Sequence, residues 1–110
     1  MAREFLSNFE FMVLLAVIQV GDDAYGVPIA AAIEDTTGRS VSLGSVYAAL
    51  ERLESKAFIT SRIGDPTPAR GGRAKRHFKV TARGLREAKA AGRAFTRLWA
   101  GIPGFEGGQS

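Results

Sequence analysis

The sequence predicts a mainly α-helical fold with one small β-hairpin, and three observations support this prediction. First, Ser7, Ser42 and Thr81 each stand directly before a run with helical spacing, where a hydroxyl can cap the first turn. Second, residues 58–63 and 76–81 alternate as strands do, and the loop between them is rich in proline and glycine. Third, the 110 residues contain no cysteine, so a hydrophobic core and not a disulfide framework must hold the fold.

The first helix is expected over residues 8–20. Ser7 and Glu10 form the Ser-x-x-Glu pattern of a capping box, in which each side chain accepts a hydrogen bond from the other residue's backbone. The residues that follow are apolar on most of the helix surface, so this helix should lie deep in the core. Gly21 and the two aspartates after it form a turn signal at its end.

A second helix is expected over residues 25–37, with Pro28 in its first turn and Gly38 at the left-handed position after its end. A third helix begins after Ser42. Its apolar residues recur at intervals of three and four and form one inner face: Leu43, Val46, Leu50, Leu53 and Ala57. The opposite face is small and polar, so another molecule can approach it closely: Gly44, Ser45, Ala48, Glu51, Arg52 and Ser55. Three helices with such tight links are typical of a helix-turn-helix.

The hairpin that follows carries most of the positive charge. The net charge of the chain is +4, and residues 62–86 contain eight lysines and arginines but only one acid, Asp65. A charge run alone is usually a solvated face, but this one directly follows a helix with a small outer face. A positive hairpin beside such a helix indicates a winged helix-turn-helix, which places helix side chains on base edges and hairpin cations on phosphates.

We therefore expect two groups of residues to contact double-stranded DNA. The helix group is Ser42, Gly44, Ser45, Tyr47, Ala48 and Arg52. The group on the hairpin, the wing, is Arg70, Gly72, Arg73, Lys75 and Arg76. Tyr47 lies at the edge of the inner face, where its ring can pack while its hydroxyl is free for a phosphate.

The last helix is expected over residues 82–100. One of its faces forms an apolar seam with coiled-coil-like spacing: Leu85, Ala88, Gly92, Phe95, Leu98 and Trp99. The seam could pack on the protein's own core, but three helices already cover so small a domain, so we favour a two-fold homodimer. The expected organisation is a winged-helix DNA-binding domain over residues 1–81, a dimerisation helix over 82–100 and a disordered glycine-rich tail over 101–110.

Enzymatic activity is not expected, and neither is a metal or another cofactor. His77 is the only histidine and has no cysteine or acid beside it, so a packed or surface side chain is the simpler interpretation. The Gly71-Gly72 pair lacks the Gly-Lys-Ser/Thr ending of a phosphate-binding loop. The longest apolar run, residues 11–18, is too short to span a membrane, and without a signal-peptide pattern we expect a cytoplasmic protein.

Several motifs fall in the order and spacing of one family. They include Ala24-Tyr25-Gly26, Ser42-Leu43-Gly44-Ser45-Val46-Tyr47, Arg52-Leu53-Glu54, Arg70-Gly71-Gly72 and Val80-Thr81 with Gly84. Over about residues 5–90 the chain thereby resembles the PadR family of bacterial transcriptional regulators. The resemblance implies a winged helix-turn-helix repressor that dimerises through its C-terminal helix, binds palindromic operators and releases DNA when a small aromatic effector binds.

The chain departs from the family pattern at a few positions. Ala57 stands where a turn glycine is usual, Ala48 where proline or threonine is common, and His77-Phe78 replaces an aromatic pair led by tyrosine. With a single C-terminal helix, any effector would bind at the dimer interface, where Phe95 and Trp99 either line a site or simply fill the interface. The alternative from a different class is a winged-helix module for protein–protein contact, with only weak and unselective DNA binding.

Overall fold

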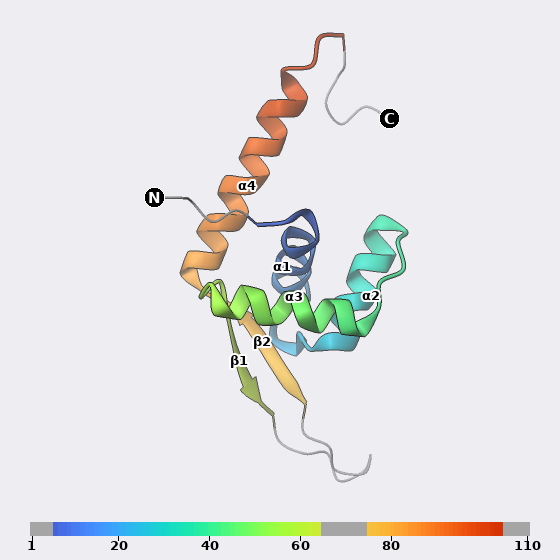
Figure 1. The fold of residues 1–110 in the computed structure, drawn as a ribbon, viewed down its shortest axis with the longest axis vertical. Helices are drawn as coiled ribbons and strands as arrows, with labels where there is room; N and C mark the ends of the chain where they lie inside the picture. The colour runs from blue at the N-terminus through green and yellow to red at the C-terminus, as the bar shows by residue number, and fades with distance from the viewer. Residues whose placement is uncertain (1–5, 65–74, 105–110) are drawn as a thin grey trace.

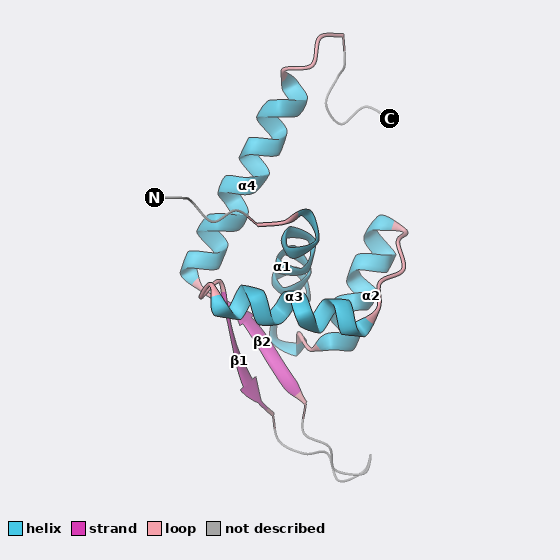
Figure 2. Ribbon diagram, in the orientation of Figure 1, coloured by secondary structure: helices cyan, strands magenta, loops and turns pink. Residues whose placement is uncertain are grey.

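The computed structural model describes residues 6–64 and 75–104. Its elements follow the order α1 (Asn8–Val20), η1 (Gly21–Asp23, a 3₁₀ turn), α2 (Gly26–Thr37), α3 (Leu43–Ser55), β1 (Ile59–Ile63), β2 (Arg76–Val80) and α4 (Ala82–Ala100). The two strands pair antiparallel (Figure 2). The predicted class, a mainly helical winged helix-turn-helix with a small hairpin, is confirmed. The expected wing residues Arg70, Gly72 and Arg73, and positions 105–110 of the expected tail, lie outside the described residues.

The helix boundaries follow from their caps. The capping box of α1 is complete, since the Ser7 and Glu10 side chains each accept the other residue's backbone N–H at 3.1 Å. The Ser42 hydroxyl accepts the N–H of Ser45 at the start of α3, and Thr81 caps α4 in the same way. Gly38 ends α2 with φ +74°, a left-handed conformation that costs glycine little. The predicted caps of all four helices are confirmed.

The core lies where α1, α2, α3 and the hairpin meet. Its largest fully buried side chains include Leu14, Ile29, Leu50, Leu53 and Ile59. Burying each such side chain contributes about 1.5–3 kcal/mol, so these contacts dominate the stability of so small a domain. The hydrophobic positions of α1 and α3 thus hold the helix-turn-helix together.

Two inner-face expectations for α3 were wrong. Leu43 is 43% exposed because it lies in the first turn, before Val46, the first residue of the helix that is buried. Ala57 lies beyond the end of the helix at Ser55 and takes φ +64°, so it forms the turn into β1 and not part of the inner face. The expectation for α1 also needs a correction, because Leu15 is 43% exposed beside a groove between α1 and α2.

The hairpin extends below α3, and it is joined to the body through both strands (Figure 1). Ser61 pairs with Phe78, and the Phe78 N–H donates to the Ala24 carbonyl at 2.8 Å, so β2 is also tied to the turn before α2. Side chains alternate between the two faces of a hairpin. Ser61 and Phe78 therefore share the face toward α3, whereas Arg62 and Lys79 lie on the other face.

Helix α4 starts at the hairpin and projects away from the body (Figure 1). Its first turns pack closely, since a methyl group on Gly84 would collide with the Phe58 carbonyl oxygen, and Ala88 is only 5% exposed. Farther along, large apolar side chains face outward, with Phe95 53% and Leu98 70% exposed. No helix in the described part of the chain has the length and apolar character needed to cross a membrane.

Candidate nucleic-acid interface

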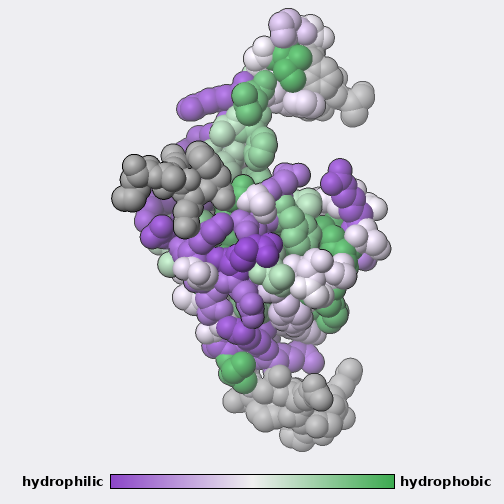
Figure 3. Space-filling view, viewed as in Figure 1, coloured by the Kyte–Doolittle hydropathy of each residue, from purple (hydrophilic) through white to green (hydrophobic). Residues whose placement is uncertain are grey.

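The outward face of α3 is open along its whole length, and its amino-terminal half is built from small residues. Gly44, Ser45 and Ala48 are all exposed, and a Cβ placed on Gly44 would have no neighbouring atom within 4 Å. Figure 3 shows this half of the helix as a pale surface, in contrast to the strongly hydrophilic surface over its carboxyl-terminal half. A flat ligand such as the edge of a nucleic-acid base can approach such a backbone closely.

Tyr47 connects this surface to the start of α2. Its side chain is 40% exposed, and its ring centroid lies 6.5 Å from that of Phe78. The rim of the ring and the hydroxyl lie against Gly26, where any Cβ would collide with them. Glycine at position 26 thus allows Tyr47 to pack between α2 and the hairpin while part of its ring stays on the surface.

Arg52, predicted to face the DNA groove, is directed toward α1. Its Nε donates to Glu10 Oε2 at 2.6 Å, and Lys56 Nζ donates to Glu10 Oε1 at 2.9 Å. The Arg52 side chain is still 51% exposed, whereas the Glu10 carboxylate is almost completely buried. Glu10 therefore ties the carboxyl-terminal half of α3 to the first turn of α1.

The electrostatics of Glu10 reflect these contacts. Burial on its own raises the pKa of this carboxyl, but the hydrogen bonds from Lys56, Arg52 and the Ser7 N–H outweigh it and lower the pKa to about 2. Glu10 is accordingly a carboxylate at any physiological pH. Arg52 and Lys56 together carry two positive charges against the one negative charge of Glu10. One net positive charge therefore remains next to the amino-terminal half of α3.

A second network joins α3 to the hairpin. Arg76 Nη2 donates to Glu54 Oε1 at 2.8 Å, and Arg76 Nε donates to the Ser61 hydroxyl at 3.0 Å. Ser61 in turn donates to Glu54 Oε2 at 2.7 Å. Lys75, the other wing residue within the described range, places its Nζ 5.1 Å from the centroid of the Tyr25 ring.

The sequence analysis missed both networks. The oppositely charged partners in these networks are 22 to 46 residues apart, and neither capping patterns nor helical periodicity relate residues at such separations. The one available signal was Glu10 itself, an acid inside an otherwise apolar helix that should lie in a core and therefore needs a cation.

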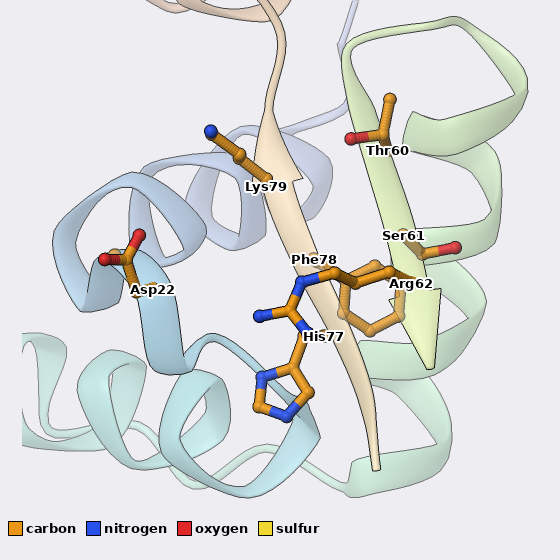
Figure 4. A pocket seen from close by; sticks show the side chains of 8 residues that line it. Asp22, Thr60, Ser61, Arg62, His77, Phe78 and Lys79 are labelled. Atoms are coloured by element: carbon orange, nitrogen blue, oxygen red, sulfur yellow. The ribbon is translucent and has the colours of Figure 1, made fainter. Parts of the chain in front are cut away.

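The other face of the hairpin forms a pocket of about 200 Å³ against the turn η1 (Figure 4). Arg62 and Lys79 contribute positive charge, and Asp22 contributes a negative one. His77 packs beside Tyr25 with ring centroids 5.6 Å apart, and its Nδ1 is buried without a hydrogen-bond partner among the described residues. In the same part of the chain, no three histidine or acidic side chains are grouped closely enough to hold a metal ion.

The predicted seam of α4 divides into two parts. Ala88 belongs to the protein's own core, contrary to the expectation of an open face, because the first turns of α4 pack against α1 and the hairpin. Phe95 is exposed on one side and stacks on Phe11 with ring centroids 5.7 Å apart. The exposed apolar side chains of the seam are Leu85, Phe95, Leu98 and Trp99.

A hollow of about 380 Å³ lies between the start of α1 and α4. Leu6 and Phe11 line it from one side and Ala94 and Phe95 from the other, and Ser7, Glu87 and Arg97 add polar and charged groups to its wall. This volume is within the range of small-molecule sites.

Comparisons with known proteins agree with this architecture. Residues 14–90 match the sequence model of the transcriptional regulator PadR-like family. A transcriptional regulator from Clostridium thermocellum has 23% sequence identity and a TM-score of 0.68, with 81% of each chain covered. A PadR-like transcriptional regulator from Bacillus cereus has 19% identity and a TM-score of 0.66, with 82% of each chain covered.

A third similar structure contains nucleic acid. Bacillus subtilis PadR in complex with operator DNA has 20% identity and a TM-score of 0.65, and the match covers 77% of this chain and 47% of that one. Among curated proteins, no sequence matches this chain.

Proposed function

The chain belongs to the PadR-like family of transcriptional regulators, and we propose that it is a sequence-specific DNA-binding repressor that acts as a homodimer on a palindromic operator. The family consists of regulators and not enzymes, in agreement with the expectation from the sequence. We place the protein in the cytoplasm, where a regulator meets bacterial DNA.

The observation that carries this proposal is the small amino-terminal half of α3 beside a basic hairpin. A B-DNA major groove about 12 Å wide admits an α-helix, and small side chains let the helix backbone approach the base edges. We assign base contacts to Ser42, Gly44, Ser45, Tyr47 and Ala48. We assign phosphate contacts to the wing residues Arg70, Gly72, Arg73 and Lys75. One similar solved structure supports DNA binding in general, because the PadR of Bacillus subtilis was crystallised with operator DNA.

The distal half of α4 supports the homodimer. Leu98 and Trp99 are 70% and 45% exposed at the end of a helix that projects from the body (Figure 1). A second copy related by a two-fold axis would bury them and place two α3 surfaces on successive turns of DNA. In this arrangement residues 1–81 bind DNA and residues 82–100 join the two copies, with the first turns of α4 fixed to the DNA-binding unit.

A small aromatic effector fits the hollow between α1 and α4. Phe11 and Phe95 supply aromatic rings at its wall, and Phe95 is also a residue of the proposed dimer seam. A compound inserted there would change the angle between α4 and the body and, through it, the spacing of the two DNA-binding units. Quenching of Trp99, the only tryptophan, by a panel of small aromatic compounds tests this step.

DNA selection tests the central proposal. The full chain first selects duplexes from a random-sequence pool at about 150 mM salt, and its affinity is then compared on the selected duplex and on a scrambled one. We expect a preference of roughly a thousandfold, the range of specific regulators. Ala48→Gln adds bulk to the small face of α3 and should reduce binding to the selected duplex at least tenfold. Ala31→Gln, on an exposed position of α2, is the matched control and should have no effect.

Weak and equal binding of the wild-type chain to both duplexes would overturn the proposal and favour a module for protein–protein contact. The dimer is tested separately by size-exclusion chromatography with light scattering, which measures the molar mass of the protein in solution. Leu98→Glu should halve the mass, whereas Arg93→Glu, on an exposed position outside the seam, should leave it unchanged.

A further inference from the structure

The network of Glu54, Ser61 and Arg76 has an unusual place in the fold. It closes a triangle of hydrogen bonds of 2.7, 2.8 and 3.0 Å that joins the last turn of α3 to both strands of the hairpin. The triangle lies on the face of the hairpin that is turned toward α3. It therefore connects the two elements that together form the candidate DNA surface.

The guanidinium of Arg76 is fixed from several directions. Besides its bonds to Glu54 and Ser61, its central carbon lies 5.5 Å from the centroid of the Phe78 ring, and Phe78 is itself a core residue with 3% exposure. A planar guanidinium that meets a carboxylate, a hydroxyl and an aromatic ring is held in one orientation, which an ammonium group could not reproduce. Arg76 is thus occupied by intramolecular partners.

Arg76 is also the first residue of β2 and directly follows Lys75, one of the predicted wing cations, while the other two, Arg70 and Arg73, come shortly before it in the sequence. Ser61 is in β1, two residues before the end of that strand at Ile63. Both strands are thus anchored to α3 at this level, in addition to the Phe78 N–H bond to Ala24 that ties β2 to the turn before α2.

We propose that Glu54 and Arg76, bridged by Ser61, are positioning residues that set the angle of the β1–β2 hairpin relative to α3 and thereby determine sequence preference. This inference rests on the proposed function and deepens it. It also reassigns Arg76, which the sequence analysis placed among the phosphate contacts. The hairpin and α3 must contact DNA at the same time. A hairpin that is not held by α3 can still bind phosphates, but it no longer favours the duplex on which α3 meets its preferred bases.

The sign of the Glu54→Gln effect separates positioning from simple electrostatics. An acid next to a DNA surface repels phosphates, so its neutralisation alone would strengthen binding to every duplex. If Glu54 positions the wing, the same variant loses about tenfold on the selected duplex and loses nothing on the scrambled one. The two explanations therefore predict opposite changes for the selected duplex.

Arg76 variants give a second, independent readout. Arg76→Lys retains the positive charge, so a phosphate contact would survive it, whereas the three-way anchor would not. We expect Arg76→Lys to reduce the preference for the selected duplex by about as much as Glu54→Gln, with an unchanged dependence of affinity on salt. Because both residues act in one anchor, the double variant should be no worse than either single variant.

Arg62→Gln is the matched control on the opposite face of the same hairpin, where Arg62 is exposed. Loss of one positive charge there would weaken binding to both duplexes alike, so the ratio of the two affinities should not change. Thermal unfolding of each variant is measured in parallel, because a merely structural role lowers the unfolding temperature and leaves the ratio of the two affinities unchanged.

Two outcomes overturn the inference while the proposed function stands. One is a wild-type chain with strong preference whose Glu54→Gln variant binds both duplexes as well as or better than wild type. The other is an Arg76→Lys variant that keeps the full preference. A wild-type chain without any preference would overturn the proposed function and this inference together.

Discussion

The two halves of α3 are built on opposite principles. In the amino-terminal half, the outward residues Gly44, Ser45 and Ala48 are small, and the one side-chain interaction on this face is local, between Ser42 and Ser45 in the part of the chain described. In the carboxyl-terminal half, Arg52 and Lys56 bond to Glu10 on α1, and Glu54 bonds to the hairpin.

This difference shows how a recognition surface can be rigid and still unobstructed. A helix is a stiff rod, so anchoring one end of it fixes the other end as well. The ionic contacts that orient α3 are placed at the end away from the small surface, and the small surface can be left without bulky side chains. The predictions below test this separation, beginning with the anchored half.

Glu10→Gln should have the largest effect. Glutamine still fits the capping box of α1, but it removes the charged partner of Arg52 and Lys56. We expect the free energy of unfolding at pH 7 to fall by about 1.5–3 kcal/mol, the range for hydrogen bonds to charged groups. Urea unfolding measures it, and Glu51→Gln, on an exposed position of α3, is the control.

The stability contribution of Glu10 should also depend on pH, in a direction that its lowered pKa predicts. The folded-state pKa of Glu10 is about 2, below the ordinary value of 4.5, so the unfolded chain takes up a proton more readily than the folded one. The contribution of Glu10 to stability is complete well above pH 4.5 and is lost as the pH falls from 4.5 toward 2. The difference between wild type and Glu10→Gln should therefore shrink over that range, and a constant difference would contradict the ion-pair explanation.

Ser42→Ala should have the next largest effect, and it tests the free half. The hydroxyl of Ser42 caps the first turn of α3, where no packed side chain would replace it. Loss of such a cap costs about 1 kcal/mol. Urea unfolding gives this value, and the loss should be the same at pH 7 and at pH 3, because no titrating group takes part. Thr36→Ala, on an exposed position of α2, should be close to neutral.

Ala57→Gly should raise the free energy of unfolding, by about 0.5–1 kcal/mol. Ala57 adopts φ +64°, where an L-residue with a Cβ is disfavoured by about 1–2 kcal/mol and glycine recovers most of this despite its larger entropy in the unfolded chain. A thermal unfolding scan measures the gain. Ala31→Gly, within α2, is the opposite control and should destabilise the protein.

Gly44→Ala should have the smallest effect on stability. It is also the most direct test of whether DNA approaches the amino-terminal half of α3. A Cβ at this position meets no atom of the protein, and alanine favours the helix, so we expect a gain of at most about 0.5–1 kcal/mol. Binding to the selected duplex should nevertheless weaken, because the methyl group occupies space on the small surface. Unchanged DNA binding would show that the duplex does not approach this half of α3 closely.

The sequence was sufficient for those features that depend on neighbouring residues. Ser7, Ser42 and Thr81 were found as caps because a cap acts over three residues, and Gly38 was found because a left-handed helix end favours glycine. The two strands of the hairpin were found because strand alternation is also a local pattern. The helical boundaries followed from these signals almost without change.

The features that were missed depend on how elements that are far apart in the sequence pack against one another. A helical wheel places Arg52 on the outer face, and it is indeed exposed, but the wheel cannot show that its guanidinium folds back to Glu10, 42 residues earlier. Periodicity assigned Ala88 to the open seam, whereas the packing of the first turns of α4 against α1 and the hairpin buries it. Leu43 fits the inner face by spacing, but it lies in the first turn of α3, before the first buried residue, Val46.

Because α4 contacts the hairpin closely at Gly84, a small change in the angle of the helix at this point displaces its far end considerably. The helix can rest directly on the Phe58 carbonyl because position 84 has no side chain, and Trp99 lies fifteen residues farther along, about 22 Å at 1.5 Å per residue. A tilt of about 10° at the Gly84 contact moves the far end of α4 by about 4 Å. In a two-fold dimer both copies move, so the change in distance between the two DNA-binding units is twice as large. In the proposed dimer, the number of base pairs between two half-sites would thus depend on the absence of one methyl group. Operator spacing could then change in evolution through residues that never touch DNA.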